Sequence, residues 1–252
     1  MKKFYFHILF SIMVLFSVIV NAQIKKKRNK KRIFNTESAD NIEKNHLQIE
    51  NVFMFENNID AFNNFFVPDI NLTYGTGFRS EVFIDVAVLN SNNQTGILPI
   101  TLGFKTNLIY EKKYLPEINL FASVQTKDLG SRIYRNSNYL PEVSLILQKK
   151  LPNKTSGEFE YGLQWIDGIG QPTKYYNLSF ETELILNFSI QYGFNYLNNS
   201  DADNFGVAKI GFSKEFVKNN LEINIMYGKY LKNDSQNYYL GIGCNKNFKL
   251  NK

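Results

Sequence analysis

The residues with the most evident chemistry in this chain are carboxylates and lysines placed at alternating positions. Glu158 and Glu160 are two residues apart, and this spacing puts both side chains on one face of a β-strand. Charges gathered on one face of several strands would bias the passage of ions through an enclosed lumen. The alternative is that they pair across strands and fill the interior. The sequence predicts nine charged side chains of this kind: Glu81, Asp85, Lys105, Glu117, Glu158, Glu160, Glu181, Lys209 and Glu222.

A second chemistry to consider is hydrolysis of lipids by a serine and a histidine. It requires a Ser, a His and an acidic or amide partner within hydrogen-bonding reach. His46 is the only His beyond the first 22 residues, and Ser179 and Ser189 lie on the polar phase of their segments without a pattern that marks a nucleophile. The single Cys244 and the two His residues show no metal-ligand spacing. We therefore expect no catalytic residue, no metal site and no cofactor.

The elements that must position these charges are strands. Phe159 to Trp165 and Leu221 to Tyr227 alternate apolar with polar residues, and a period of two is the signature of a strand. Most segments have about 9–14 residues, close to the length that a tilted strand needs to cross a bilayer. Twelve segments are predicted: 46–57, 66–75, 78–89, 97–110, 115–126, 139–150, 156–166, 174–182, 185–197, 204–216, 220–230 and 237–248.

The connections between these segments alternate in length. Short ones such as Gly75–Gly77 and Leu151–Lys154 follow every second segment, and mostly longer, more polar ones such as 127–138 follow the others. Outer-membrane barrels have short periplasmic turns and longer outside loops. The predicted fold is therefore all-β: a single antiparallel transmembrane β-barrel of the outer membrane, with about 12 strands and both termini on the periplasmic side. In a soluble barrel, the aromatic-rich apolar phase would point inward and overfill the lumen.

Aromatic side chains also gather near the predicted strand ends. Tyr110, Trp165, Tyr175, Tyr227 and Tyr230 are examples. Amphipathic rings favour the interface between hydrocarbon and water. We interpret these residues as facing that interface, although the β-propensity of Tyr accounts for some of them.

The N-terminal region has the pattern of a secretion signal. Lys2 and Lys3 precede an apolar run, and Val20-Asn21-Ala22 ends in a small residue, as a cleavage site requires. The run is shorter than the ~18 residues expected of a spanning helix. We predict a signal peptide at 1–22, a disordered basic lead-in at 23–45, a barrel at 46–248 and a tail at 249–252.

The positive net charge of the chain belongs to its N-terminal region. Lys2, Lys3 and the seven basic residues between Lys25 and Arg32 leave 20 basic residues against 23 acidic ones. A basic run of this kind is usually disordered and solvated, and the alternative is attraction to anionic lipid, cell wall or a periplasmic partner. An exported chain does not meet nucleic acid, so we expect no nucleic-acid partner.

Several short segments carry a resemblance to a known family. They are Glu37-Ser38-Ala39, Glu43–Glu50, Pro68–Gly75, Gly96–Lys105 and the closing Tyr239–Phe248. Together they resemble the exported barrels named for the MetA pathway of phenol degradation, which are described as transporters. The likeness spans about Glu37 to Phe248, and Ile97 stands where the family has an Asp. It implies an outer-membrane channel and brings no catalytic residues.

These features lead to one hypothesis about function and two alternatives. The chain is expected in the outer membrane of a Gram-negative cell, surrounded by outer-membrane lipid. Its polar and mildly acidic lumen would allow passive passage of small molecules, with neutral or cationic solutes favoured. The alternatives are a structural or assembly subunit of an outer-membrane complex and a barrel enzyme acting on lipids. The sequence leaves the solute unidentified.

Overall fold

The computed structural model describes residues 41–57, 64–77, 79–91, 94–168, 170–198, 205–231 and 237–250. The predicted signal peptide and the basic run Lys25 to Arg32 lie outside these residues. The predicted lead-in is described only from Asn41, and the first strand begins at His46, where the sequence predicted it.

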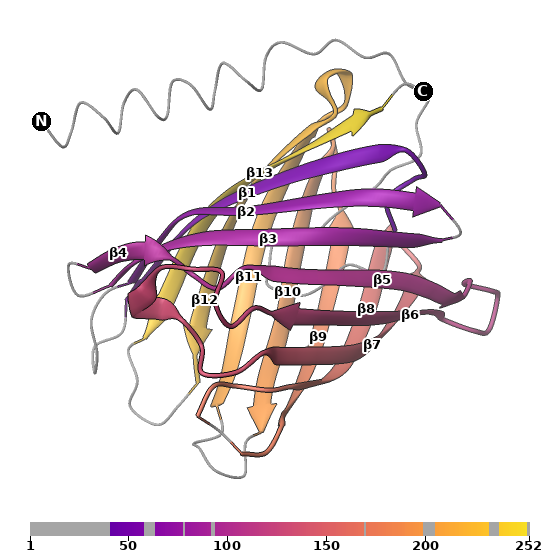
Figure 1. Cartoon of the computed structure of the whole chain (residues 1–252). Coiled ribbons are helices and arrows are strands. Elements are labelled where there is room, and N and C mark those ends of the chain that lie inside the picture. The colour runs from indigo at the N-terminus through magenta and orange to yellow at the C-terminus, as the bar shows by residue number, and fades with distance from the viewer. Residues whose placement is uncertain are drawn as a thin grey trace, which may run out of the picture.

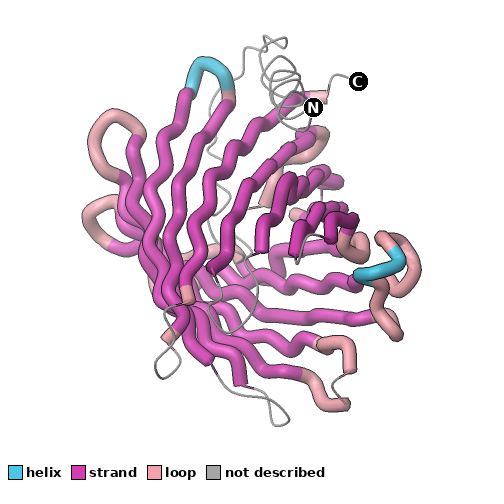
Figure 2. Tube along the Cα trace, turned by 90° about the vertical axis from the view of Figure 1, so that its left-hand side faces the viewer, coloured by secondary structure: helices cyan, strands magenta, loops and turns pink. Residues whose placement is uncertain are grey.

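The described chain is built almost entirely from strands, with two short 3₁₀ turns (Figure 2). Neither turn, η1 (Arg132–Tyr134) nor η2 (Val217–Asn219), is long and apolar enough to cross a membrane. The strands, in chain order, are β1 (His46–Asn57), β2 (Asn64–Gly77), β3 (Ser80–Ser91), β4 (Gln94–Ile97), β5 (Thr101–Ile109), β6 (Glu117–Gln125), β7 (Leu140–Leu151), β8 (Thr155–Gln164), β9 (Thr173–Glu183), β10 (Phe188–Asn198), β11 (Phe205–Phe216), β12 (Leu221–Tyr230) and β13 (Tyr238–Lys249).

The sheet closes on itself. β1 pairs antiparallel with β13 from His46↔Lys249 to Asn57↔Tyr238, and it also pairs with β2. In Figure 1 the first strand, in indigo, lies beside the yellow last strand. β2 in turn pairs with β3, and the remaining long strands follow in sequence order. The result is a closed antiparallel barrel of twelve long strands, which confirms the predicted fold class.

The wall departs from a regular ladder between β3 and β6. The predicted strand 97–110 is interrupted, because residues 98–100 separate β4 from β5 and Pro99 has no N–H to donate. The loop after β6 replaces the missing partners. Ile97 N–H donates to Ser131 Oγ at 2.8 Å, and Ile100 N–H donates to the Leu129 carbonyl at 2.9 Å. This loop therefore completes the wall beside β4.

The two faces of the wall have opposite character. Apolar side chains on the outer face are exposed, as for Val82 and Leu102. Residues on the alternate phase of the strands point inward, and among them Glu81 and Asn119 are almost completely buried. The apolar phase of the alternation therefore faces outward, as the sequence predicted. A wall with this polarity matches lipid outside and a polar interior.

A small apolar cluster interrupts the polar interior. Phe83 and Phe121 stack with their ring centroids 5.4 Å apart, and Ile146 packs with them. These three residues come from β3, β6 and β7 and point into the barrel. They fill part of the lumen, as side chains do in small barrels.

We predict that an Arg at mid-strand on the outer face destabilises the barrel in a bilayer. Leu145 and Leu151 lie on the same phase of β7 and are similarly exposed, at 41% and 40%, but Leu151 is at the strand end. Leu145→Arg should lower the free energy of unfolding by about 2–4 kcal/mol, and Leu151→Arg by at most about 1 kcal/mol. Urea unfolding in lipid vesicles measures both. Equal losses would contradict a hydrocarbon layer at the level of Leu145.

Candidate functional site

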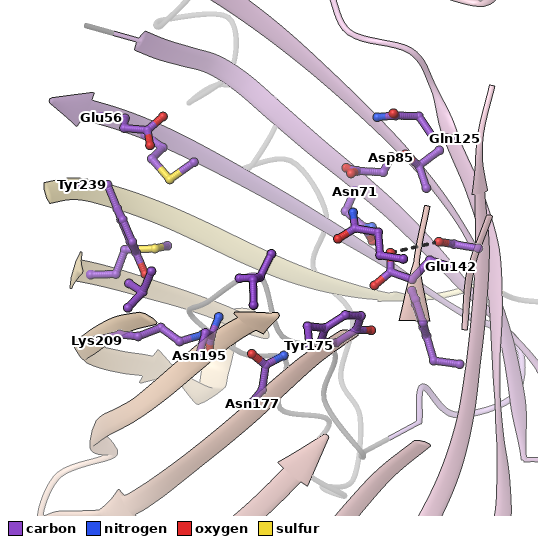
Figure 3. Close-up of a pocket in the computed structure, with 18 of the residues that line it drawn as sticks. Glu56, Asn71, Asp85, Gln125, Glu142, Tyr175, Asn177, Asn195, Lys209 and Tyr239 are labelled. Carbon is purple, nitrogen blue, oxygen red and sulfur yellow. Dashed lines mark hydrogen bonds between the residues drawn. The ribbon is translucent and has the colours of Figure 1, made fainter. Parts of the chain in front are cut away.

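A cavity of about 530 Å³ lies inside the barrel (Figure 3). Its lining comes from the ends of strands nearest the longer loops. Thr101 begins β5, Gln125 ends β6 and Tyr230 ends β12. The lining residues are Met54, Glu56, Asn71, Phe83, Asp85, Thr101, Phe121, Ser123, Gln125, Glu142, Gln164, Tyr175, Asn177, Asn195, Leu197, Val207, Lys209, Met226, Tyr230 and Tyr239. The cavity therefore occupies the half of the lumen on the long-loop side.

Charged residues in the cavity lining are mainly acidic. Glu56, Asp85 and Glu142 are carboxylates, and Lys209 is the lysine among the lining residues. Asp85 on β3 and Lys209 on β11 come from different sides of the ring (Figure 3). Of the nine predicted side chains, these two line the cavity, whereas Glu56 and Glu142 were not among the nine. The lining as a whole carries a negative formal charge.

Three aromatic rings in the lining lie over glycines of neighbouring strands. Tyr175 faces Gly162 in the β8–β9 register, and Tyr239 faces Gly228 in the β12–β13 register. A Cβ added to Gly162 would stand 2.3 Å from the Tyr175 ring, and one added to Gly228 would stand 2.2 Å from the Tyr239 ring. Phe83 stands in the same relation to Gly103. Because glycine has no side chain, each ring can lie close to the wall, which leaves more room in the cavity.

Glu160 lies just beneath this lining and joins three strands. Its carboxylate accepts hydrogen bonds from Ser144 Oγ at 2.7 Å, Tyr175 Oη at 3.1 Å and Asn177 Nδ2 at 2.7 Å. The side chain is buried, and a buried carboxylate needs several donors of this kind. Glu160 therefore orients Tyr175 and Asn177, which do line the cavity.

Glu81 and Lys105 form an ion pair in the other half of the lumen. The Lys105 ammonium lies 2.9 Å from Glu81 Oε1, and side-chain exposure is 1% for Lys105 and 3% for Glu81. Each residue faces the other directly in the β3–β5 register. Two buried charges in contact compensate each other's loss of hydration. The pair fills space near the short-turn end of the barrel.

The remaining four predicted residues lie towards the short turns and do not belong to the cavity lining. Glu117 begins β6, where Asn107 Nδ2 donates to its Oε1 at 2.8 Å. Glu158 is buried on β8, and Glu181 and Glu222 lie near the short-turn ends of β9 and β12. The structure therefore divides the nine residues into two levels of the lumen.

No family model matches the chain, and no curated protein matches it in sequence. Several solved structures are similar to it in fold. An outer-membrane channel from Pseudomonas putida F1 is similar, with a TM-score of 0.68 and 10% identity over 85% of this chain and 100% of that one. The KdgM porin has a TM-score of 0.56 at 12% identity, over 79% of this chain and 99% of the porin. The NanC porin has a TM-score of 0.58 at 7% identity, over 80% of this chain and 100% of the porin.

The fold is that of an outer-membrane β-barrel. The barrel shares with these structures the arrangement of its strands, and the low identities limit the likeness to the fold. The solute that can pass depends on the residues that line this chain's own lumen.

The histidine considered for a hydrolytic site lies at the short-turn end of the barrel. His46 Nδ1 is 3.1 Å from the Lys44 carbonyl, and its Nε2 is 3.9 Å from Glu43. Ser179 and Ser189 lie further along the chain on β9 and β10, where both are buried. Among the described residues, no cluster of three or more His, Cys, Asp or Glu side chains could hold a metal ion.

Two aromatic residues have a different orientation from the one predicted. Tyr175 and Tyr230 were expected at the lipid interface, but both line the cavity, and Tyr230 Oη donates to Glu56 Oε1 at 2.5 Å. The prediction used their nearness to strand ends and not the phase of each strand. The phase of each strand predicts the inward orientation, because Tyr175 shares its face with Asn177 and Ser179, and Tyr230 shares its face with Gly228.

The loop between β6 and β7 is hydrogen-bonded to the loop between β8 and β9. Ser137 donates to Asp167 through its hydroxyl, at 2.6 Å from Oδ1, and through its backbone N–H, at 2.9 Å from Oδ2. These hydrogen bonds hold the pKa of Asp167 below its ordinary value, and the bond from the Ser137 hydroxyl has the largest effect. Because they favour the charged carboxylate, the link is complete above the ordinary pKa of Asp and is lost as the pH falls through the lowered one.

We predict that Ser137→Ala raises the pKa of Asp167 towards its ordinary value, because the hydroxyl donor is lost while the backbone donor stays. An NMR titration of the Asp167 carboxyl carbon measures the change. Ser131→Ala is the control, because the Ser131 hydroxyl bonds to Ile97 and not to Asp167. An unchanged titration in Ser137→Ala would show that the hydroxyl does not hold the loop.

We also predict that Gly162→Ala destabilises the barrel by about 1–3 kcal/mol, as overpacking does. The new methyl group would displace the Tyr175 ring and weaken its bond to Glu160. Urea unfolding measures the loss, and Gly170→Ala, with no atom within 4 Å of the added Cβ, is the control. Tyr175→Leu combined with Gly162→Ala should recover part of the stability. A Gly162→Ala variant as stable as the control would contradict the close contact.

Proposed function

We propose that the barrel is an outer-membrane channel for the passive passage of small polar molecules. The observation that carries this proposal is the cavity of about 530 Å³ within the closed ring of strands. Its lining is polar, so a hydrated solute exchanges water for side-chain hydrogen bonds there. An exposed apolar outer face gives the barrel its place in lipid.

The similar solved structures support a channel as the function. One is described as an outer-membrane channel and two others as porins. One structure of the KdgM porin holds disordered oligogalacturonate, and it has a TM-score of 0.58 and 12% identity with this chain. We assign the chain to the transporter barrels that its motifs resemble. Two of those motifs, Pro68–Gly75 and Tyr239–Phe248, lie in β2 and β13.

The charge of the cavity lining favours neutral or cationic solutes. Glu56, Asp85 and Glu142 outnumber Lys209 among the lining residues. Negative charge in a narrow lumen raises the local concentration of cations and repels anions. The aromatic rings of Tyr175 and Tyr239 add flat surfaces on which an organic solute can pack. The proposed solute is therefore a small organic molecule without net negative charge.

Planar-bilayer recording of the purified full chain tests this function. Wild type should conduct, and in a KCl gradient its reversal potential should show a preference for cations. Asp85→Asn combined with Glu142→Gln should move that potential towards zero, because two of the three cavity carboxylates are neutralised. Asp128→Asn, in the exposed loop after β6, is the matched control and should leave it unchanged. The channel would be refuted if no folded variant of the chain conducts and none takes up solute in liposome swelling.

A further inference from the structure

The residues just before β1 turn back into the barrel instead of leaving it. Asn45 has a φ of 61°, in the left-handed region that Asn tolerates. His46 N–H donates to the Glu43 carbonyl at 3.1 Å, which closes a tight turn. Asn45 N–H donates to the Gly75 carbonyl at 2.9 Å. The segment Asn41–Asn45 is thereby directed along the inner side of β2.

The segment lies directly on the backbone of β2. A Cβ added to Gly75 would stand 2.1 Å from the Glu43 carbonyl oxygen and 2.7 Å from that of Ile42. Only glycine allows this approach, because no real Cβ comes so close to a backbone atom. Ile42 is itself buried. Gly75 therefore provides the space in which the segment lies.

Two further polar contacts connect the segment with β3 and β6. Ile42 N–H donates to Glu81 Oε2 at 2.7 Å, while the other oxygen of that carboxylate contacts Lys105. Asn41 Nδ2 donates to Asn119 Oδ1 at 3.0 Å. The contacts reach β3 and β6, so the segment extends from β2 along the inner side of the neighbouring strands. They lie at the level of the Glu81–Lys105 ion pair, away from the cavity.

The wall is held mainly by its own strand pairing, although the Gly75 carbonyl of β2 also accepts a hydrogen bond from Asn45 N–H of the segment. β2 pairs with β1 and with β3, with an irregularity between Gly75 and Gly77 on the β3 side, and Glu81 keeps Lys105 as a partner when Ile42 leaves. The docked segment is bound by a few polar contacts that water can replace in a wet lumen. Its release therefore leaves a complete barrel with more free cross-section.

We propose that Asn41–Asn45 is a displaceable plug of the channel, docked on the lumen faces of β2, β3 and β6. In the docked state it narrows the short-turn half of the lumen, and release of the Glu81 and Asn119 contacts widens the path from the cavity to that end. This inference rests on the proposed channel function and names its regulation. Glu81 is the receptor residue of the plug, since it accepts the one charge-assisted hydrogen bond that the segment makes through its backbone.

Ile42→Pro is the sharpest variant for a test, because proline has no N–H and leaves the barrel wall unchanged. Loss of a hydrogen bond to a charged group should shift the balance towards the released state by about tenfold or more. Ile42→Val retains the N–H donor and is the matched control. In planar-bilayer recordings of the full chain, the open fraction should rise in Ile42→Pro and stay near wild type in Ile42→Val. The shift in gel mobility on heating verifies that each variant is folded.

A reversible cross-link provides the second measurement. In a Cys244→Ser background, Asn41→Cys with Asn119→Cys places thiols at a contact of the docked plug. A short bifunctional methanethiosulfonate should hold the channel at its low conductance even when Ile42→Pro is added, and a reductant should restore the high conductance. Asn41→Cys alone should not respond.

The possible outcomes separate the plug from the channel. If wild type and Ile42→Pro conduct equally, and the cross-link changes nothing, the plug is refuted and the channel remains. If no folded variant conducts, including Ile42→Pro, the channel function is refuted and the plug with it. Conductance that rises in Ile42→Pro and falls on cross-linking establishes both.

Discussion

The need to satisfy every backbone hydrogen bond within a hydrocarbon layer constrains the whole molecule. A sheet can meet this need only by closing, because an open edge exposes unpaired N–H and C=O groups. The pairing of β1 with β13 over the full length of both strands removes that edge. Once twelve strands are closed, the alternation of side chains puts apolar residues against lipid and polar ones inside. The polar character of the lumen is therefore a consequence of closing the sheet.

The interior resolves into two levels with different packing. On the short-turn side, the Glu81–Lys105 pair and the segment Asn41–Asn45 fill the space with bonded groups. On the long-loop side, rings that lie over glycines leave a cavity with an acidic lining. A barrel of twelve strands is intermediate in width between eight-stranded barrels, which side chains fill, and barrels of sixteen or more strands, which hold an open pore. In this barrel the short-turn half is filled by side chains, and the long-loop half holds a cavity.

Strand positions and faces could be predicted because the alternation of period two is visible in the sequence. The first strand begins at His46 as expected, and the inward phase that contains Glu81, Lys105 and Glu160 was also identified. The interruption at Pro99 was missed, since the loop around Ser131 that replaces the ladder is 34 residues away from Ile97. Contacts at such distances depend on strand register, which a single sequence does not contain.

The cavity was less accessible to prediction than the wall. The phase of Tyr175 indicates that it points inward, but its position over Gly162 depends on which residues face each other in β8 and β9. The lining carboxylate Glu142 was likewise absent from the predicted set, because its neighbourhood reads as an ordinary strand end. Asn41–Asn45 belongs to the stretch predicted as a basic, disordered lead-in, so its path was not predicted. Gly75 offered a clue, since a glycine on the inner face marks a close approach of backbone.

Asn45 also carries a consequence for the order in which the chain folds. Its N–H is bonded to β2, while its carbonyl accepts a hydrogen bond from Leu250 N–H, just after the last strand. Asn45 thus connects β2 with the residue that follows the last strand. Because the β1–β13 seam pairs residues about 200 positions apart, closing it is costly in chain entropy and comes late. The hydrogen bond between Leu250 and Asn45 therefore forms only when the seam closes, because closure brings the residue after β13 next to the turn before β1.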